Sequence, residues 1–148
     1  MGKIEAINIT NISEENTFYI NQAFLEKGKG IVNDRYYENF KEKKEQVTLI
    51  NLEDIDNFNK QIKQNIDAKD FRRNIIVSGI NLNELIDIKI KVNEITLKIH
   101  EICQPCKYLQ DRLKIPGLVK MLVNKSGVRA EILSSGSLSV GDVIKILK

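Results

Sequence analysis

Cysteine and histidine are scarce in this sequence. The 148 residues include two cysteines, Cys103 and Cys106, and one histidine, His100. A small secreted scaffold held by disulfides needs more cysteines, so that class of protein is excluded. A closed structural zinc site takes four Cys or His ligands, which argues against such a site within one chain and leaves only one shared across a dimer. The two cysteines are therefore either a functional thiol pair or two buried, inert side chains.

Long apolar runs are also missing. No segment approaches the roughly 20 apolar residues that cross a membrane, and a charge interrupts the first residues at once, unlike a secretory signal. Hydrophobic residues make up 42% of the chain and charged residues 29%, which is the composition of a folded domain. We therefore expect a single domain, residues 1–148, in the cytoplasm, with no membrane partner.

Arginine is rare and the net charge is small. Five arginines stand among 23 basic residues, and the net charge of +3 does not indicate nucleic acid as a partner. Residues 106–148 carry eight basic and three acidic side chains, so this segment either favours an anionic ligand or is a solvated surface. Because lysine is the common cation here, the few arginines indicate positions where a planar guanidinium is needed.

Alternating and apolar segments predict a strand-rich domain. Strands are expected at 3–9, 47–50, 75–77, 88–92, 95–99, 128–133 and 143–147. Helices are expected at 52–66, 81–86, 106–114 and 116–124. Residues 11–46 predict irregular structure, and 136–142 a turn. Since regular βαβ alternation is absent, the pattern predicts a β-barrel-like α+β domain of about seven or eight short strands.

The segment Cys103-Gln104-Pro105-Cys106 is the sharpest chemical feature. We expect it where a strand passes into a helix whose first turn includes Pro105 and Cys106, so that the helix N-terminus favours a thiolate on Cys106. Such a thiolate would bind a soft metal such as molybdenum, carry a persulfide sulfur or exchange disulfides. A thioredoxin-like fold has its C-x-x-C early in the chain, whereas this motif comes two-thirds of the way along. Its position therefore argues against a thioredoxin-like oxidoreductase.

Two further segments contain candidate residues. Arg72-Arg73-Asn74 precedes an apolar strand, where two guanidinium groups and an amide suit a phosphate or another oxyanion, or else form ordinary salt bridges. The loop from Gly28 to Tyr36 is no dinucleotide fingerprint, because no strand–turn–helix context surrounds it. Its glycines allow a tight turn or a close approach to a ligand.

Five motifs follow one another along the chain, and together they carry more information than any one of them. They are Gly28-x-Gly30-x-x-Asn33-Asp34-Arg35-Tyr36, Gln46-Val47-Thr48-Leu49-Ile50, Arg72-Arg73-Asn74-Ile75 with Gly79 and Leu82, Cys103-x-Pro105-Cys106-x-x-Leu109, and Pro116 to Lys120 followed by Gly127 to Leu133 and Gly141-Asp142. In this order they resemble the MOSC family, which is named after the C-terminal domain of molybdenum cofactor sulfurases. The resemblance covers residues 3–147 and is greatest to the short, free-standing bacterial members. Asn33 and Asn93 stand where that family usually has glycine.

The resemblance implies a closed, mixed β-barrel with short peripheral helices. It also implies a link to the molybdenum cofactor (molybdopterin), with Cys106 as the metal ligand or persulfide carrier and Cys103 as a second thiol. The residues that it places near the cofactor are Asp34, Arg35, Arg72, Arg73, Asn74 and Arg129.

Three functions follow as hypotheses. The first is a module that binds the molybdenum cofactor or carries sulfur. The second is a small molybdenum-dependent reductase or sulfurtransferase, and the third is a thiol redox protein that uses the C-x-x-C pair. We expect no pyridoxal phosphate site and no ferredoxin domain on this chain. Sulfur or electrons would therefore come from separate partners, such as a cysteine desulfurase or a molybdoenzyme, and whether the chain is itself an enzyme stays open.

Overall fold

The computed structural model describes residues 2–12 and 15–147. Its helices are α1 (Leu52–Ile62), α2 (Lys107–Leu113) and α3 (Leu118–Met121), with single 3-10 turns η1 (Lys43–Glu45), η2 (Ala68–Phe71) and η3 (Leu82–Leu85). Its strands are β1 (Gly2–Ile9), β2 (Phe18–Ile20), β3 (Gln22–Glu26), β4 (Gly30–Ile31), β5 (Val47–Asn51), β6 (Ile75–Ser78), β7 (Lys89–Val92), β8 (Ile95–Ile102), β9 (Val128–Ser134), β10 (Gly136–Ser139) and β11 (Val143–Leu147).

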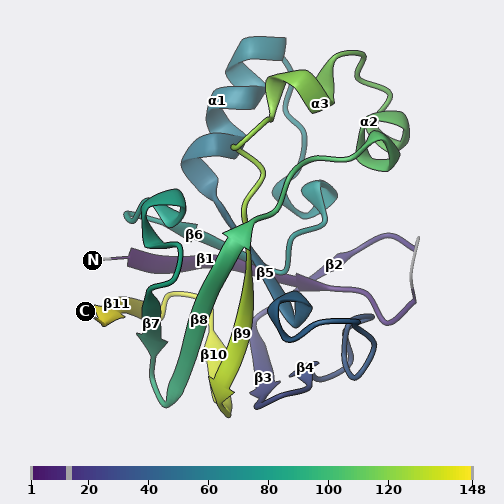
Figure 1. The fold of residues 1–148 in the computed structure, drawn as a ribbon. Helices are drawn as coiled ribbons and strands as arrows, with labels where there is room; N and C mark the ends of the chain where they lie inside the picture. Colours follow the sequence, from purple (N-terminus) through teal and green to yellow (C-terminus); the bar gives the residue numbers. More distant parts are fainter. Residues whose placement is uncertain (1, 13–14, 148) are drawn as a thin grey trace.

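Seven of these strands close into a mixed barrel (Figure 1). The order around the barrel is β11-β7-β8-β9-β5-β6-β1, and β1 pairs with β11 through Gly2 and Lys3 to close it. Strands β5 and β6 run parallel, and their neighbours around the barrel run antiparallel. This architecture confirms the closed mixed barrel that the resemblance implied.

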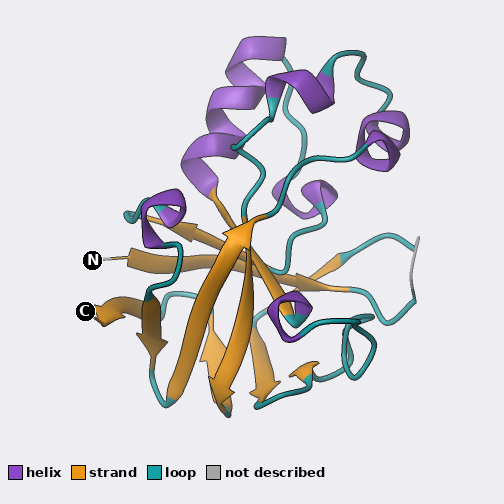
Figure 2. Cartoon of the chain, viewed as in Figure 1, coloured by secondary structure: helices purple, strands orange, loops and turns teal. Residues whose placement is uncertain are grey.

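Two apolar clusters hold the barrel and the helices together. One fills the barrel with the inward-facing residues of its strands, such as Leu49 and Ile75. The other joins the outward-facing Ile50 and Ile76 to the helices, and it includes Phe71, whose ring meets that of Phe58 edge-on at 5.8 Å. Figure 2 shows the helices α1, α2 and α3 gathered at one end of the strands. The candidate functional site lies beside this second cluster, with which it shares Phe71 and Leu109.

The expectation for residues 11–46 is wrong in part. Strands β2, β3 and β4 lie in this stretch, and β3 pairs with β10, which forms where only a turn was expected. These strands have two to five residues, so the alternation in each is too short to recognise in the sequence. The seven barrel strands are all near their predicted positions. Helix α1 ends at Ile62 rather than at residue 66 because Lys63 adopts a left-handed conformation.

None of the helices in the described part of the chain is long and apolar enough to span a membrane.

Candidate functional site

A cavity of about 250 Å³ lies where the helices meet the barrel. It brings together four of the residues that the sequence singled out, namely Arg35, Arg72, Arg73 and Cys106, from three segments that are far apart in the chain. Among the described residues, no carboxylate lines it. The full lining consists of Arg35, Tyr36, Phe71, Arg72, Arg73, Cys106, Tyr108 and Leu109. The cavity therefore combines positive charge, aromatic rings and one thiol.

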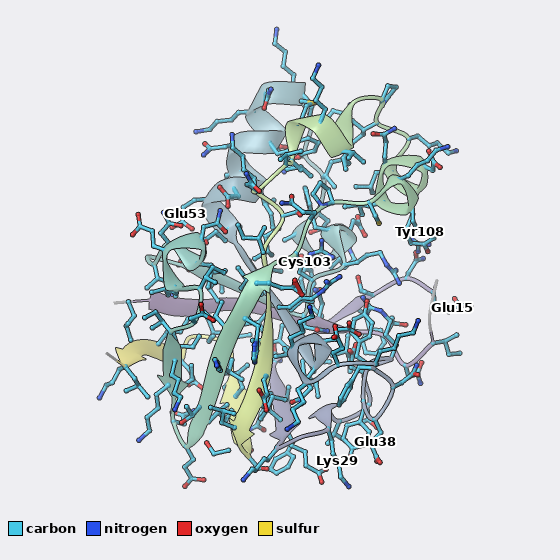
Figure 3. The ribbon with its side chains drawn as sticks, viewed as in Figure 1. Glu15, Lys29, Glu38, Glu53, Cys103 and Tyr108 are labelled. Atoms are coloured by element: carbon cyan, nitrogen blue, oxygen red, sulfur yellow. The ribbon has the colours of Figure 1, made fainter. Side chains whose placement is uncertain are left out.

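Arg72 is a buried cation at the centre of this arrangement. It follows η2 in a left-handed conformation, with φ of 63°, which is uncommon for a residue with a side chain. Its Nη1 donates to the carbonyl of Glu15 at 2.5 Å, and its guanidinium lies 5.8 Å from the centre of the Tyr108 ring. Figure 3 shows Tyr108 and Glu15 on the same side of the molecule. Burial first, and then the charge of Arg35, lower the pKa of Arg72. Because a guanidinium stays charged at neutral pH, the site holds positive charge that an anion would stabilise.

Arg35 is held beside Arg72 by the loop that follows β4. Its Nη2 donates to the carbonyl of Arg72 at 3.0 Å, and its guanidinium lies 4.4 Å from the Tyr36 ring. Its Nη1 lies 3.4 Å from the carboxylate of Asp34, which also accepts the backbone N–H of Thr10 at 3.2 Å. Asp34 does not line the cavity, so its observed contribution is to fix the loop and the position of Arg35.

The backbone of this loop also fits its sequence. Asn33 has a φ of 74°, so asparagine keeps the left-handed turn at the position where the resembling family usually has glycine. Gly30 has a φ of 124°, and a Cβ there would lie 3.3 Å from the carbonyl oxygen of Gln46. A glycine suits both the positive φ and this close approach to Gln46, which directly precedes β5.

Arg73 and Asn74 connect the cavity to the barrel. Arg73 donates through Nε to the carbonyl of Ser126 at 2.7 Å and through Nη2 to that of Gln104 at 3.4 Å. Asn74 is fully buried, and its side-chain oxygen accepts both the backbone N–H and the hydroxyl of Thr48 at 3.1 Å. Asn74 therefore bridges β6 and β5 beneath the site, and a contact of its own with a cofactor stays a prediction.

The two cysteines differ in environment. Cys106 is exposed at the cavity, and both thiols are free. Cys103 is buried, with its N–H bonded to the carbonyl of Gly127 at 2.8 Å and its own carbonyl bonded to the hydroxyl of Ser126. Figure 3 shows Cys103 at the end of β8. The expected helix start is wrong by one residue: Cys106 is the N-cap of α2, and Pro105 precedes the first turn.

Arg129 lies outside the cavity lining. Its Nη1 is 3.5 Å from the carboxylate of Glu101, which also pairs with Lys44 at 2.9 Å. Its predicted role toward a cofactor stays a prediction. His100, the one histidine, pairs with Glu131 at 2.9 Å.

Tyr108 and Arg112 were not predicted from the sequence, and Tyr36 was named there only as part of the loop motif. Arg112 donates to the hydroxyl of Tyr108 at 3.1 Å. Burial is the largest cause of the lowered pKa of Arg72, and the charge of Arg112 lowers that pKa further. Tyr108 and Arg112 are four residues apart on α2, the spacing that places side chains on one helix face, and this is the signal that could have found them. In the described part of the chain no three His, Cys, Asp or Glu residues cluster as metal ligands, so Cys106 is the ligand this cavity offers to a soft metal.

Inorganic phosphate is expected to stabilise the native protein by binding to the cavity arginines. At about ten times its dissociation constant it should raise the thermal unfolding midpoint by roughly 3 °C, because only the native state binds it. Arg72→Gln should remove most of this shift, whereas Lys60→Gln, on the exposed face of α1, should keep it. Differential scanning calorimetry against sodium chloride of matched ionic strength measures the effect. An equal rise in both variants would show a general salt effect instead of a site.

The sequence and the fold were compared with known proteins. The profile of the MOSC domain matches residues 36–145, and no curated protein matches the sequence. The structure is similar to the YuaD protein from Bacillus subtilis, with a TM-score of 0.83 at 18% identity over 99% of this chain and 96% of that one. It is also similar to YiiM from Geobacillus stearothermophilus (TM-score 0.81, 15% identity, 100% and 76% covered) and to YiiM from Escherichia coli (0.74, 11%, 99% and 70%). At these identities the solved structures establish the fold.

Proposed function

Because this chain belongs to the MOSC domain family, a family related to the molybdenum cofactor, we propose that it binds that cofactor, with Cys106 as the sulfur ligand of the metal or as a persulfide carrier. The observation that supports the proposal most directly is the convergence of three guanidinium groups and one exposed thiol on a single cavity that no described carboxylate lines. An anionic cofactor that carries a metal would need both kinds of group: guanidinium groups for its negative charge and a thiol for its metal.

The cavity fits one end of such a ligand but is too small to enclose all of it. Ligand pockets commonly have volumes of about 300–1,000 Å³, and this cavity has about 250 Å³. The cavity would therefore hold the phosphate end, to which Arg35, Arg72 and Arg73 would donate charge-assisted hydrogen bonds. The remainder of the ligand would lie at the surface, beside the exposed Tyr108 and Cys106. When bound, the cofactor would supply the redox or sulfur chemistry at its metal.

The arginines are prepared for this role by their own contacts. Arg35 and Arg73 use part of their guanidinium groups on the carbonyls of Arg72, Ser126 and Gln104, which fixes their orientation. Arg72 donates one hydrogen bond to the carbonyl of Glu15, which uses one of the five N–H donors of its guanidinium. Donors are thus left for a phosphate, and they need little reorganisation to bind it.

As a sulfur carrier, Cys106 would act without any net redox change. Its thiolate attacks the outer sulfur of a persulfide on a donor protein such as a cysteine desulfurase. The new bond joins the Cys106 sulfur to that outer sulfur, the donor's S–S bond breaks, and the donor leaves as a thiolate. The exposure of Cys106 supports this role, since a protein donor must reach the thiol.

Purified protein that is offered the cofactor should retain pterin, which is measured by its fluorescence after denaturation. Arg72→Gln should weaken retention by about 10- to 100-fold, because a buried hydrogen bond to a charged group is lost. Lys60→Gln serves as the matched control on the exposed face of α1. If neither the protein as isolated nor the protein offered the cofactor retains pterin, the binding proposal fails.

A further inference from the structure

Five lysines gather on the outer face of the barrel where β1, β11, β7 and β8 lie side by side. We call this set the lysine face. In β7 the lysines alternate with the buried Ile90 and Val92, and in β11 Lys145 follows the buried Ile144, so these lysine side chains face outward. The register then pairs like charges directly: Lys91 lies opposite Lys145, and Lys89 opposite Lys98. The members of the lysine face are Lys3, Lys89, Lys91, Lys98 and Lys145.

Within the part of the chain that the structure describes, these lysines form no ion pairs. Among residues 2–12 and 15–147, no carboxylate lies within ion-pair distance of any of the five. Glu131 lies across from Lys98, but it pairs with His100 at 2.9 Å. Like charges placed directly opposite each other across two strands destabilise a sheet. This arrangement therefore carries a cost in the free chain that an anionic partner would offset.

Apolar side chains lie among the lysines. Val143 and Leu147 are 48% and 39% exposed, and they line a surface hollow of about 650 Å³ together with Lys91 and Lys145. Asp142 also borders the hollow, but its carboxylate accepts hydrogen bonds from Asn93 at 2.8 Å and from the backbone N–H of Ser139 at 2.7 Å. The hollow thus combines exposed aliphatic surface with positive charge.

The lysine face is separate from the Cys106 cavity. In Figure 1, β7 and β11 lie at the left of the barrel, whereas α2, which borders the cavity, lies at the upper right. Neither the lysines nor the exposed aliphatic residues line that cavity. An inference about this face therefore does not depend on the proposed function.

We propose that the lysine face docks a partner protein whose surface presents carboxylates beside apolar side chains. Charge complementarity requires an acidic partner, and the exposed Val143 and Leu147 require that the partner also bury apolar area. A nucleic acid fits less well, because this face has neither arginine for bidentate phosphate contacts nor aromatic rings for stacking on bases. Two kinds of side chain would thus recognise the partner, namely the lysines and the exposed aliphatic residues, which the strand register places next to each other.

A titration of the ¹⁵N-labelled protein tests this docking surface. The probes are a random glutamate–tyrosine copolymer, polyglutamate and a single-stranded DNA oligonucleotide, all at one ionic strength. Amide shifts should change in β1, β7 and β11, and the copolymer should bind more tightly than either of the other probes. Lys91→Glu combined with Lys145→Glu should weaken binding of the copolymer by about tenfold, and Val143→Ser with Leu147→Ser should remove its advantage over polyglutamate.

The controls separate a specific face from general charge. Lys60→Glu with Lys120→Glu makes the same change of charge on α1 and α3, and it should leave binding nearly unchanged. The Lys91→Glu/Lys145→Glu protein should still be stabilised by phosphate, which shows that its fold and its cavity are intact. Tighter binding of DNA than of the copolymer, equal losses in the two lysine variants, or shifts confined to other elements would each overturn the proposal.

Discussion

Cys106→Ser is expected to abolish sulfur loading completely, whereas Cys103→Ala should leave it intact. After incubation with a cysteine desulfurase and cysteine, intact-mass spectrometry should show one added sulfur atom on the wild type and on Cys103→Ala, and none on Cys106→Ser. The reason is access: Cys106 is exposed at the cavity, while Cys103 is 3% exposed, donates its backbone N–H to the carbonyl of Gly127 and accepts the hydroxyl of Ser126 at its own carbonyl. A serine hydroxyl cannot form the S–S bond.

The same experiment separates the roles proposed for the cysteine pair. Loss of the adduct in both single variants would show that the two thiols act together, as in a thiol redox protein, and would contradict the assignment to Cys106 alone. An absent adduct in the wild type would reject the carrier role, and pterin retention by Cys106→Ser and by the wild type would then decide whether the thiol is a metal ligand.

The barrel could be predicted from sequence because its strands follow simple periodicity. The residues on either side of Asn93 and Glu94 alternate between lysine or threonine and isoleucine, leucine or valine, and they form β7 and β8 as expected. Strands β2 and β4 have three and two residues, and their existence depends on pairing with β1 and β3, which are themselves placed by the fold. Contacts of this kind leave no periodic signal in the sequence.

The site was predictable to the extent that rare residues mark it. Arg35, Arg72 and Arg73 stand out against 18 lysines, and the structure places all three on one cavity. Tyr108 and Arg112 were not predicted: their four-residue spacing places them on one helix face, but it does not show which cavity that face borders. The left-handed conformation of Arg72 was also not predictable, since it is imposed by the end of η2.

Gly127→Ala is expected to destabilise the protein by more than about 4 kcal/mol, which is a large share of the roughly 5–15 kcal/mol that holds a domain folded. Gly127 has a φ of 101°, and a Cβ built there overlaps the carbonyl oxygen of Leu49 on β5 and lies 3.2 Å from the Cβ of Ile50. Both neighbours belong to the barrel wall, so neither can move away without disrupting the pairing of β5 with β9. Urea unfolding, followed by far-UV circular dichroism, measures the loss.

Gly117→Ala is the matched control for this change. Gly117 also has a positive φ, 83°, but a Cβ there meets nothing within 4 Å, so only backbone strain of about 1–2 kcal/mol is expected. The difference between the two variants therefore measures the close approach of the chain to β5. The site depends on that approach, because the carbonyl of Gly127 holds Cys103 and the carbonyl of Ser126 holds Arg73. Equal losses in the two variants would mean that β5 yields to a side chain, and that the position of Arg73 and the C-x-x-C segment is set by other contacts.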